Sequence, residues 1–375
     1  MAIDPNAVAL VELVSLRRAE LAARMVDRLQ AEFPGYAAHE RAELQQRAEF
    51  GIEYIAKMLV SGEGPNPALL DTFADLGRLR ARDGVGLRTL IRGVRLSVRE
   101  AMEFAQSLAD GSELGSGSTF SLATELWDWM EVLTDRISPE NLGEEERLAR
   151  EAAEARCVGA VVGGTAGAHE LAEAALACDL DPALHYHVLR ADLDGARREQ
   201  LWPRRGAGGV SAVLDGELVG LLAALPCRPL SFLAGVGPAL PLTSGRQSYL
   251  VAGRVLQSAR GSCTGLVTLA GVGLRASVVA DAAMGEVLAA RYLEPLRVLG
   301  DFGAQLLDSV QAYFDAEQNI DDAARALFVH PNTLRHRLTR FEEATGASLR
   351  RAEHIAEIWW VLTRRSLERV PTPQR

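Results

Sequence analysis

Apolar residues recur three and four positions apart through the first 140 residues, the spacing that places them on one face of an α-helix. The clearest runs are AVALVELVSLRRAELAARMVDRLQAEF, RAEFGIEYIAKMLV and, after the turn SGEGPNP at 61–67, ALLDTFADLGRLRARDGVGLRTLIRGVRLSVREAMEFAQSLA. The Gly- and Ser-rich run DGSELGSGS at 110–118 interrupts the pattern, and TFSLATELWDWMEVLTDRI resumes it. The pattern predicts an all-helical bundle over residues 1–140.

Residues 141–156, NLGEEERLAREAAEAR, keep a helical character but carry many charges and few large apolar side chains. A segment of this composition cannot bury a core of its own, and alternating charges are typical of a solvated helix. We therefore expect a helical connector here, with a domain boundary at its end.

The pattern changes at Cys157, where short apolar runs and alternating segments replace the helical spacing. CVGAVVGG is typical of a short strand, AHELAEAALAC of a helix and ALHYHVLRA of a strand. The run VSAVLDGELVGLLAAL places Asp215 and Gly216 between two apolar segments, which predicts a hairpin with a type I′ turn. A strand at LSFLAGVG, a helix at RQSYLVAGRVLQSA and a strand at TGLVTLAGVG follow. We expect an α/β domain of ferredoxin-like order over 157–290.

Helical spacing returns over residues 291–375, in AQLLDSVQAYFDA, DDAARALF, PNTLRHRLTRFEEATG and EHIAEIWWVLTRRSLERV. A short FVH connection separates two of these helices, and Pro331 suits the first position of the second one. Two helices joined by a turn of three or four residues are the helix-turn-helix pattern. The predicted fold class is therefore multidomain, α and α/β, with an N-terminal helical bundle, a central α/β domain and a C-terminal all-α helix-turn-helix domain.

The second helix of this pair, about 331–345, has an apolar and a polar face. At 100° per residue, Leu334, Leu338 and Phe341 cluster on the side that we expect to face the core. The candidate DNA-binding residues lie opposite or on the flanks: Asn332, Thr333, Arg335, His336, Arg337 and Arg340. Side chains of these types can donate to phosphates and bond base edges in the major groove. A solvated amphipathic helix without a ligand would show the same spacing, so that interpretation stays open.

The chain as a whole is acidic, with a formal net charge of -10, whereas residues 323–341 contain no acidic residue. Excluding acids from this stretch avoids local repulsion of a polyanion. The overall charge argues against a nucleic-acid coat protein and a polybasic membrane binder. We find neither a signal peptide nor an apolar run long enough for a membrane span, so we expect a soluble cytoplasmic protein without a membrane partner.

Candidate catalytic and metal-binding groups are sparse. The cysteines, Cys157, Cys178, Cys227 and Cys263, show neither CxxC spacing nor pairing with histidine. His185 and His187 share one face of a predicted strand, but two ligands alone make a weak metal site. The loop VVGGTAG at 161–167 lacks the GKS or GKT ending of a phosphate loop. We expect no catalytic residue, no metal and no cofactor.

The C-terminal motif NIDDAARALFVHPNTLRHRLTRFEEATG resembles the helix-turn-helix of the PucR/CdaR family of bacterial transcriptional regulators, in which the pattern A..L.VH.NTLRYRL.R.E..TG recurs. Pro331 stands where a basic residue is common in that family, and His336 stands where tyrosine is common. The resemblance implies binding of double-stranded DNA. Carried over by position, the implied recognition surface consists of Asn332, Thr333, Arg335, His336 and Arg340.

Two further resemblances lie upstream. Residues 157–290 are similar to the degenerate GGDEF-like domain of the CdaR group, and VLDGELVG stands at the hairpin where an active diguanylate cyclase has its GGDEF or GGEEF motif. The segment LGRLRARDGVGLRTLIRGVRLSVRE at 76–100 resembles the N-terminal helical domain of RsbR-type stress regulators, a globin-like sensor without haem. These resemblances imply a catalytically silent middle domain and a signal-receiving domain at 1–140.

We expect a non-enzymatic transcriptional regulator that binds a two-fold-symmetric operator as a homodimer or higher oligomer. Its signal, for example a small-molecule effector, would enter through the N-terminal or central domain. Two alternatives remain open. One is a protein-only stress-signalling scaffold. The other is a nucleotide-handling, cyclase-like enzyme, for which the available acids are Asp179, Asp181, Asp192, Asp194 and Asp215.

Overall fold

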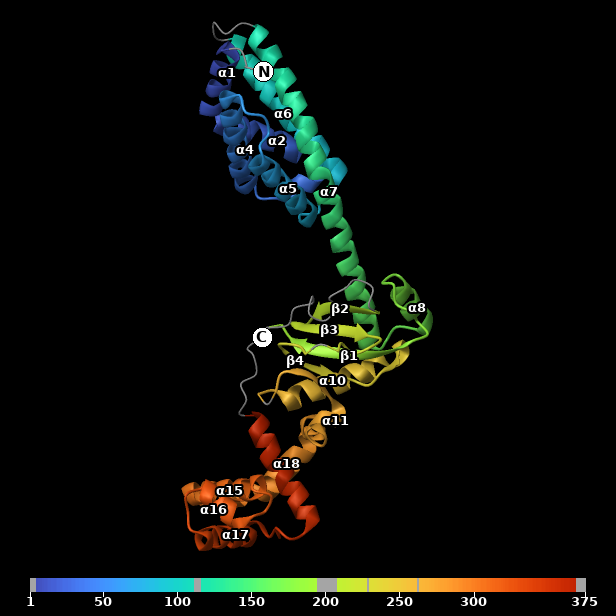
Figure 1. Cartoon of the computed structure of the whole chain (residues 1–375), viewed down its shortest axis with the longest axis vertical. Coiled ribbons are helices and arrows are strands. Elements are labelled where there is room, and N and C mark those ends of the chain that lie inside the picture. The colour runs from blue at the N-terminus through green and yellow to red at the C-terminus, as the bar shows by residue number, and fades with distance from the viewer. Residues whose placement is uncertain (1–4, 111–115, 194–207, 228, 262, 369–375) are drawn as a thin grey trace. The chain divides into compact units, whose positions relative to one another are not determined.

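The computed structural model describes residues 5–110, 116–193, 208–227, 229–261 and 263–368. Contacts divide the chain into two compact units, Met1–Glu151 and Ala152–Arg375. The predicted fold class is confirmed, because helices form the N-terminal part, a mixed sheet forms the middle and helices form the C-terminal part (Figure 1). The predicted break at 110–118 falls largely outside the described residues.

The first unit contains α1 (Pro5–Leu16), α2 (Arg18–Glu32), α3 (Pro34–Ala37), α4 (Arg41–Ser61), α5 (Pro67–Arg82), α6 (Leu87–Asp110) and the first part of α7 (Ser116–Gly163). The predicted turn between α4 and α5 is confirmed. Gly62, with φ 68°, ends α4 in the left-handed conformation that glycine adopts without a steric cost. The side chain of Asn66 then caps α5 by accepting from the backbone N of Leu69 at 2.9 Å.

Apolar side chains from several of these helices meet in one core, as the helical spacing predicts. Leu10 of α1, Leu21 of α2, Leu69 of α5 and Phe104 of α6 are fully buried. Burial of each such side chain is worth roughly 1.5–3 kcal/mol. Figure 1 shows α1 to α6 packed together beside the first part of α7.

Helix α7 is a single helix of 48 residues, and it contains the predicted connector 141–156. The predicted strand at CVGAVVGG is wrong, because this stretch continues α7 as far as Gly163. Its large apolar side chains are buried, and their spacing places them on one side of a helix. They are Cys157, Val158, Val161 and Val162. Gly164, with φ 72°, then turns the chain.

A six-stranded sheet forms the middle of the chain. Its strands are β1 (His185–Asp192), β2 (Gly209–Leu214), β3 (Glu217–Leu222), β4 (Leu233–Val236), β5 (Leu240–Pro241) and β6 (Gly265–Thr268). The strand order is β2-β3-β1-β4-β6, with β5 paired to β1. Within the described part of the sheet, β4 and β6 pair in parallel and the other pairs are antiparallel. β4 and β6 end together at the pair Val236 and Thr268. The rest of the predicted TGLVTLAGVG strand therefore has no partner and forms α11 (Leu269–Val272) instead.

The predicted hairpin is confirmed. Leu214 pairs with Glu217, and the two turn residues between them, Asp215 and Gly216, have φ of 49° and 80°. Positive φ at both positions is what a type I′ turn requires. The antiparallel order β2-β3-β1-β4 agrees with the predicted ferredoxin-like arrangement, which also has a helix between its third and fourth strands. Here the described residues between β3 and β4 form no helix, because Pro226 and Pro229 interrupt this short stretch.

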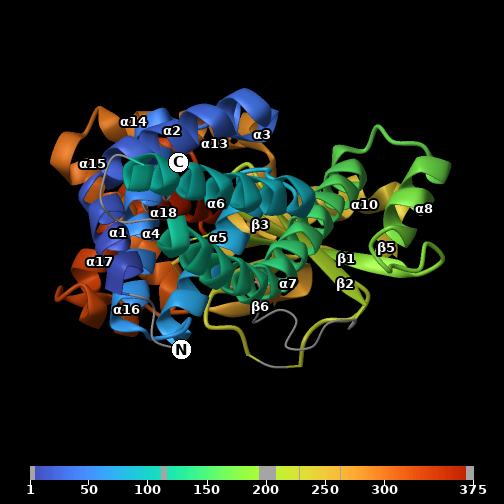
Figure 2. The ribbon, with the colours of Figure 1, turned by 90° about the horizontal axis from the view of Figure 1, so that it is seen from above.

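Helix α10 (Gly245–Ala259) packs directly on the sheet, against β1 and β4. The approach is close: a Cβ atom at Gly235 of β4 would lie 2.3 Å from the carbonyl oxygen of Ala252. Helix α8 (Ala168–Leu176) contacts the 3-10 helix η1 (Leu242–Ser244), which in turn contacts β5. Figure 2 shows α8 at the same end of this unit as β5.

The C-terminal helices are α12 (Arg275–Ala280), α13 (Ala282–Tyr292), α14 (Glu294–Arg297), α15 (Gly300–Asp315), α16 (Ile320–Ala326), α17 (Pro331–Thr345) and α18 (Ala352–Glu368). They share a core to which Leu306 and Val310 of α15, Ala323 of α16 and Ile358 of α18 contribute. Among the helices that the structure describes, none has the length and apolar character of a membrane span.

Candidate nucleic-acid interface

The first helix of the helix-turn-helix pair, α16, has a defined start. The side chain of Asn319 accepts from the backbone N of Asp321 at 2.9 Å and of Asp322 at 3.2 Å. These bonds satisfy donors that a helix N-terminus otherwise leaves unpaired. The two aspartates also place negative charge where the helix dipole favours it.

The turn between α16 and α17 has the hydrogen bonds of a Schellman motif. The backbone N of Phe328 donates to the carbonyl oxygen of Arg325 at 3.2 Å, and that of Val329 donates to Ala324 at 3.0 Å. Phe328, with φ 55°, occupies the left-handed position that glycine usually takes in this motif. The phenylalanine side chain is 96% exposed.

Helix α17 covers the predicted range 331–345 and is capped at both ends. His330 caps its start, since the imidazole Nδ1 accepts from the backbone N of Asn332 at 3.2 Å. Pro331 occupies the first turn, as predicted, and Gly346 ends the helix with φ 66°. The capping role of His330 was missed from the sequence, although an acceptor side chain just before a helix-starting proline could have suggested it.

The predicted core face of α17 is confirmed. Leu334 and Phe341 are fully buried, and Leu338 is almost so. They join the core formed by α15, α16 and α18. This packing fixes which side of α17 is turned outward.

The outward side brings together most of the predicted DNA-binding residues. The exposed ones are Asn332, Thr333, Arg335, His336 and Arg340. The guanidinium of Arg335 donates to Asn332 Oδ1 at 2.8 Å, so these two side chains form one polar group at the start of the helix. Arg337 differs, because it is half-buried and donates to Gln305 Oε1 of α15 at 3.0 Å. The part that each residue plays toward DNA stays a prediction.

Acidic residues border the acid-free stretch 323–341 and pair with two of its four arginines. Arg325 Nη1 lies 2.7 Å from Asp322 Oδ1, and Arg340 pairs in the same way with Glu343. The other two arginines of the stretch bond neutral oxygen atoms, as described above. The positive charge that no neighbouring acid offsets therefore lies in the N-terminal half of α17.

Two of the acids considered for a cyclase-like site have separate partners. Asp192 pairs with Arg260 at 2.7 Å, and Asp181 Oδ1 accepts from the backbone N of Ala183 at 2.9 Å. Asp194 lies outside the described residues. Within the described part of the chain, no three His, Cys, Asp or Glu side chains are grouped to hold a metal ion.

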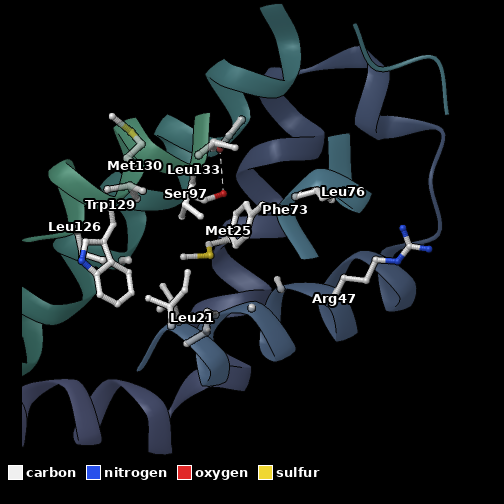
Figure 3. Close-up of a pocket in the computed structure, with 18 of the residues that line it drawn as sticks. Leu21, Met25, Arg47, Phe73, Leu76, Ser97, Leu126, Trp129, Met130 and Leu133 are labelled. Carbon is white, nitrogen blue, oxygen red and sulfur yellow. Dashed lines mark hydrogen bonds between the residues drawn. The ribbon is translucent and has the colours of Figure 1, made fainter. Parts of the chain in front are cut away.

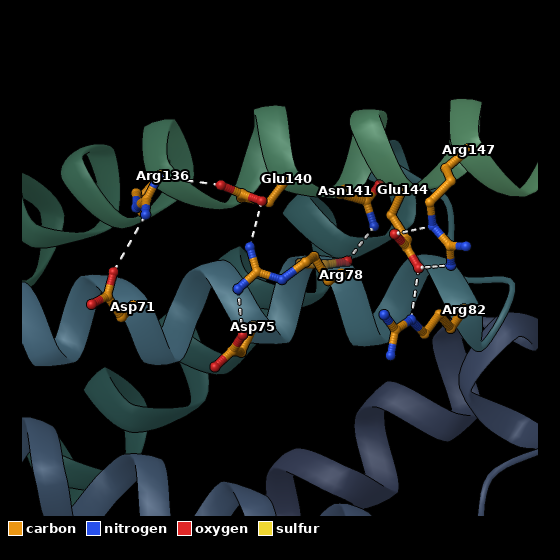
Figure 4. A network of polar contacts seen from close by, with 10 residues as sticks. Asp71, Asp75, Arg78, Arg82, Arg136, Glu140, Asn141, Glu144 and Arg147 are labelled. Carbon is orange, nitrogen blue, oxygen red and sulfur yellow. Dashed lines mark hydrogen bonds and ion pairs between the residues drawn. The ribbon is translucent and has the colours of Figure 1, made fainter. Parts of the chain in front are cut away.

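At the other end of the chain, charged pairs fix α7 to α5 (Figure 4). Glu144 of α7 is buried, and it accepts from Arg147 Nε at 2.9 Å and from Arg82 Nε of α5 at 2.6 Å. Arg147 and Arg82 lower the pKa of Glu144 to about 2. Beside them, the fully buried Asn141 donates to the carbonyl oxygen of Gly77 at 2.9 Å. The row continues with two more pairs, Arg78 with Glu140 and Arg136 with Asp71. The sequence predicted a charged connector here, but not this contact with α5.

Two families of known domains match the chain. Residues 306–363 match the PucR C-terminal helix-turn-helix domain. Residues 19–156 match the N-terminal domain of the RsbT co-antagonist protein rsbRD, a range that includes the predicted connector. Neither match extends over residues 157–305, so the likeness of this part to a GGDEF-like domain stays a prediction.

Matches to individual proteins cover a smaller part of the chain or show little sequence identity. An uncharacterized protein of Mycobacterium bovis and one of Mycobacterium tuberculosis are each 43% identical over 67 residues, which is 17% of this chain and 16% of theirs. A regulator of polyketide synthase expression from Bifidobacterium adolescentis, whose crystal structure is known, has 15% sequence identity to this chain. The match covers 58% of this chain and 94% of that chain. Its TM-score of 0.29 is too low to carry an argument about the fold. The chain thus contains a region similar to the RsbRD N-terminal domain at 19–156 and a region similar to the PucR helix-turn-helix domain at 306–363.

Proposed function

We propose that the chain regulates transcription by placing α17 in the major groove of double-stranded DNA. The observation that carries this proposal is the outward side of α17, where Asn332, Thr333 and His336 stand exposed above a fully packed inner side. The N-terminal residues of such a helix reach base edges in helix-turn-helix complexes. Asparagine can bond adenine through two hydrogen bonds, and arginine can bond guanine or phosphate.

Two copies of the chain would bind together. One helix-turn-helix buries little surface on DNA, and dimers gain affinity and specificity by contacting two half-sites. The half-sites of such an operator lie about one turn of DNA, ~34 Å, apart and are related by two-fold symmetry. We propose a homodimer or higher oligomer on an operator of this form.

Selection of DNA fragments bound by the full-length chain, followed by substitution in α17, tests this proposal. Arg340→Ala should weaken binding to every sequence and lower the slope of log affinity against log salt by about one unit, as loss of one phosphate contact would. Asn332→Ala or His336→Ala should instead relax sequence preference, at a cost of roughly 1–3 kcal/mol for each good base contact.

Arg351→Ala is the matched control, because Arg351 is exposed and pairs with Glu353 outside α17. It should leave both the affinity and the salt slope unchanged. If the triple variant Asn332→Ala, His336→Ala, Arg340→Ala folds and still binds the selected operator as tightly as the native chain, α17 is not the recognition helix.

The cyclase-like alternative has a direct test. We propose that the middle of the chain is not catalytic, since Asp181 and Asp192 have separate partners and the described residues contain no group of three His, Cys, Asp or Glu side chains that could hold a metal ion. Steady turnover of GTP to a cyclic or dinucleotide product in the presence of Mg²⁺ or Mn²⁺ would contradict this.

The signal is proposed to enter through the RsbRD-type domain. Helix α7 supports this part of the proposal, because it belongs to that domain and continues without a break to Gly163. A signal can shift the DNA-binding equilibrium only by binding two states of the protein with different affinity.

A further inference from the structure

The first unit contains a partly open cavity of about 260 Å³. Its wall is formed by side chains of all seven described helices of the unit, α1 to α7. Figure 3 shows Leu21 and Met25 of α2 facing Leu126 and Trp129 of α7 across it, with Phe73 of α5 on the other side of Met25. Almost all of the wall is apolar.

The charged groups of the wall are already paired. Arg80 lies 3.0 Å from Asp83, and its guanidinium covers the ring of Tyr36 at 5.3 Å. Arg47 pairs with Glu43, and in Figure 3 its guanidinium is turned away from the apolar side chains. A carboxylate or phosphate placed in the cavity would therefore meet no unpaired cation of the wall.

Neutral polar side chains of the wall also make hydrogen bonds within the protein. Ser97 donates to the carbonyl oxygen of Gly93 in its own helix at 3.0 Å, and Trp129 Nε1 donates to Glu125 at 2.9 Å. Tyr36 also lines the cavity, and burial raises the pKa of its hydroxyl group. The wall thus offers few hydrogen bonds to an uncharged ligand.

Small residues on α6 create the space. The residues that line the cavity from this helix include Gly93, Ser97, Ala101 and Ala105, which follow each other at intervals of four. Residues at that interval share one helical face. Large side chains elsewhere on α6, such as Phe104, pack into the core instead. The cavity therefore follows from the sequence of α6 and is not a chance defect between poorly matched helices.

We propose that this cavity binds one uncharged, apolar molecule of about ten carbon atoms. An engineered apolar cavity of about 150 Å³ stays dry and binds benzene, so about 260 Å³ corresponds to roughly ten carbons at the same filling. Such a ligand would cover apolar side chains that are only half-buried without it, among them Ile52, Ile55 and Phe73. Removing their apolar surface from water supplies the affinity.

If the chain regulates transcription as proposed above, this cavity is a site where its signal could bind. Only this regulatory role of the cavity rests on the proposed function. Leu122, Leu126, Trp129, Met130 and Leu133 line the cavity from α7. A ligand would therefore touch the helix that leaves the RsbRD-type domain. Binding of the ligand itself does not depend on whether α17 recognises DNA.

Isothermal titration calorimetry of the full-length chain with naphthalene and 2-naphthoate tests the ligand class. The two probes share their rings and differ by one carboxylate. We expect saturable binding of one naphthalene, and binding of 2-naphthoate weaker by about tenfold or more, because a desolvated carboxylate finds no partner. No saturable binding of naphthalene, or tighter binding of 2-naphthoate, would overturn the proposal.

Two substitutions locate the probe. Ser97→Leu should fill the cavity and weaken naphthalene binding by about tenfold or more, as overpacking does. Ser107→Leu is the matched control, because Ser107 is an exposed serine of the same helix whose hydroxyl also bonds its own backbone. Equal binding by the native chain and a folded Ser97→Leu variant would show that naphthalene sits elsewhere.

Circular dichroism shows whether the Ser97→Leu variant folds. If it does not fold, Leu126→Ala, which enlarges the cavity, tests the same site. The enlarged cavity should bind phenanthrene, which adds a third ring, about tenfold more tightly than the native chain does. An unchanged phenanthrene affinity would contradict the assigned site. Operator binding is measured on the same proteins without probe, so a chain that binds naphthalene but no DNA overturns the proposed function alone.

Discussion

Phe328 carries two unfavourable features at one position of the helix-turn-helix. Its φ of 55° is a conformation in which a side chain with a Cβ atom is strained by about 1–2 kcal/mol. Its aromatic ring is almost fully exposed and therefore returns no packing energy. Glycine would satisfy the same Schellman hydrogen bonds without the Cβ atom.

We therefore expect Phe328→Gly to stabilise the C-terminal helices. Relief of strain exceeds the extra chain entropy of glycine, which costs roughly 0.5–1 kcal/mol, so the net gain should be below about 1.5 kcal/mol. The thermal midpoint of the full-length chain, followed by circular dichroism at 222 nm, measures the effect.

The variant Phe328→Ala distinguishes the effect of relieving backbone strain from the effect of removing the aromatic ring. Alanine removes the ring but keeps the Cβ atom, so it should bring no comparable gain. A Phe328→Gly variant that melts below both the native chain and Phe328→Ala would mean that the ring contributes to stability in a way the exposed side chain does not suggest.

At the scale of elements, the contact between α5 and α7 should depend on pH through Glu144. Its folded-state pKa is about 2, below the ordinary value of 4.5, because Arg147 and Arg82 hold the charged form. A lowered acid pKa adds stability that is fully present above pH 4.5 and is lost as the pH falls toward 2.

Glu144→Gln should accordingly lower the thermal midpoint of the first unit at pH 7 by roughly 3–12 °C, since hydrogen bonds to a charged group are worth about 1.5–3 kcal/mol. The difference from the native chain should shrink as the pH falls below 4.5. Glu146→Gln, an exposed change two positions along the same helix, is the control and should have little effect. A gap between native chain and Glu144→Gln that stays constant down to pH 2.5 would contradict the role of Glu144.

The elements differ in how far the sequence alone could predict them. Helix α17 was predictable because a helix-starting proline, a regular apolar face and a terminal glycine all agree. The stretch from Cys157 to Gly163 was not, because a short run rich in valine has no periodicity that separates a strand from a buried helix. That choice is settled by packing: the stretch continues a helix already formed, and its apolar side is covered by Leu171, Tyr186 and Val219.

The candidate site likewise contains features that the sequence predicts and features that it does not. The outward residues of α17 follow from their spacing, whereas Gln305 could not have been expected as the partner of Arg337, because the two residues lie on different helices. The cavity of the first unit could not be predicted from the sequence either. Its volume depends on how seven helices fit together, and no single segment carries that information.

At the scale of the whole molecule, each compact unit has hydrophobic clusters of its own. We therefore expect a fragment of residues 152–375 to fold and to bind the operator selected by the full-length chain. The fragment should form the same oligomer and lose any response to a signal. Sedimentation analysis and operator binding by the fragment check these expectations.

A fragment that is folded but monomeric, and that no longer binds the operator, would have a different meaning. The first unit would then hold two copies together, and its removal would abolish DNA binding without any signalling role. The fragment of residues 1–151 is the complementary control, because it should be dimeric in that case.

The unbroken course of α7 has a consequence for how chains of this kind can vary in length. Each residue added to a helix advances it by about 1.5 Å and turns everything beyond it by about 100°. Two extra residues between Arg147 and Cys157 would rotate one end against the other by about 200°, whereas seven would change the angle by only about 20°. If α7 passes a signal by its rotational phase, related chains with the same two terminal domains should differ here by near-multiples of seven residues.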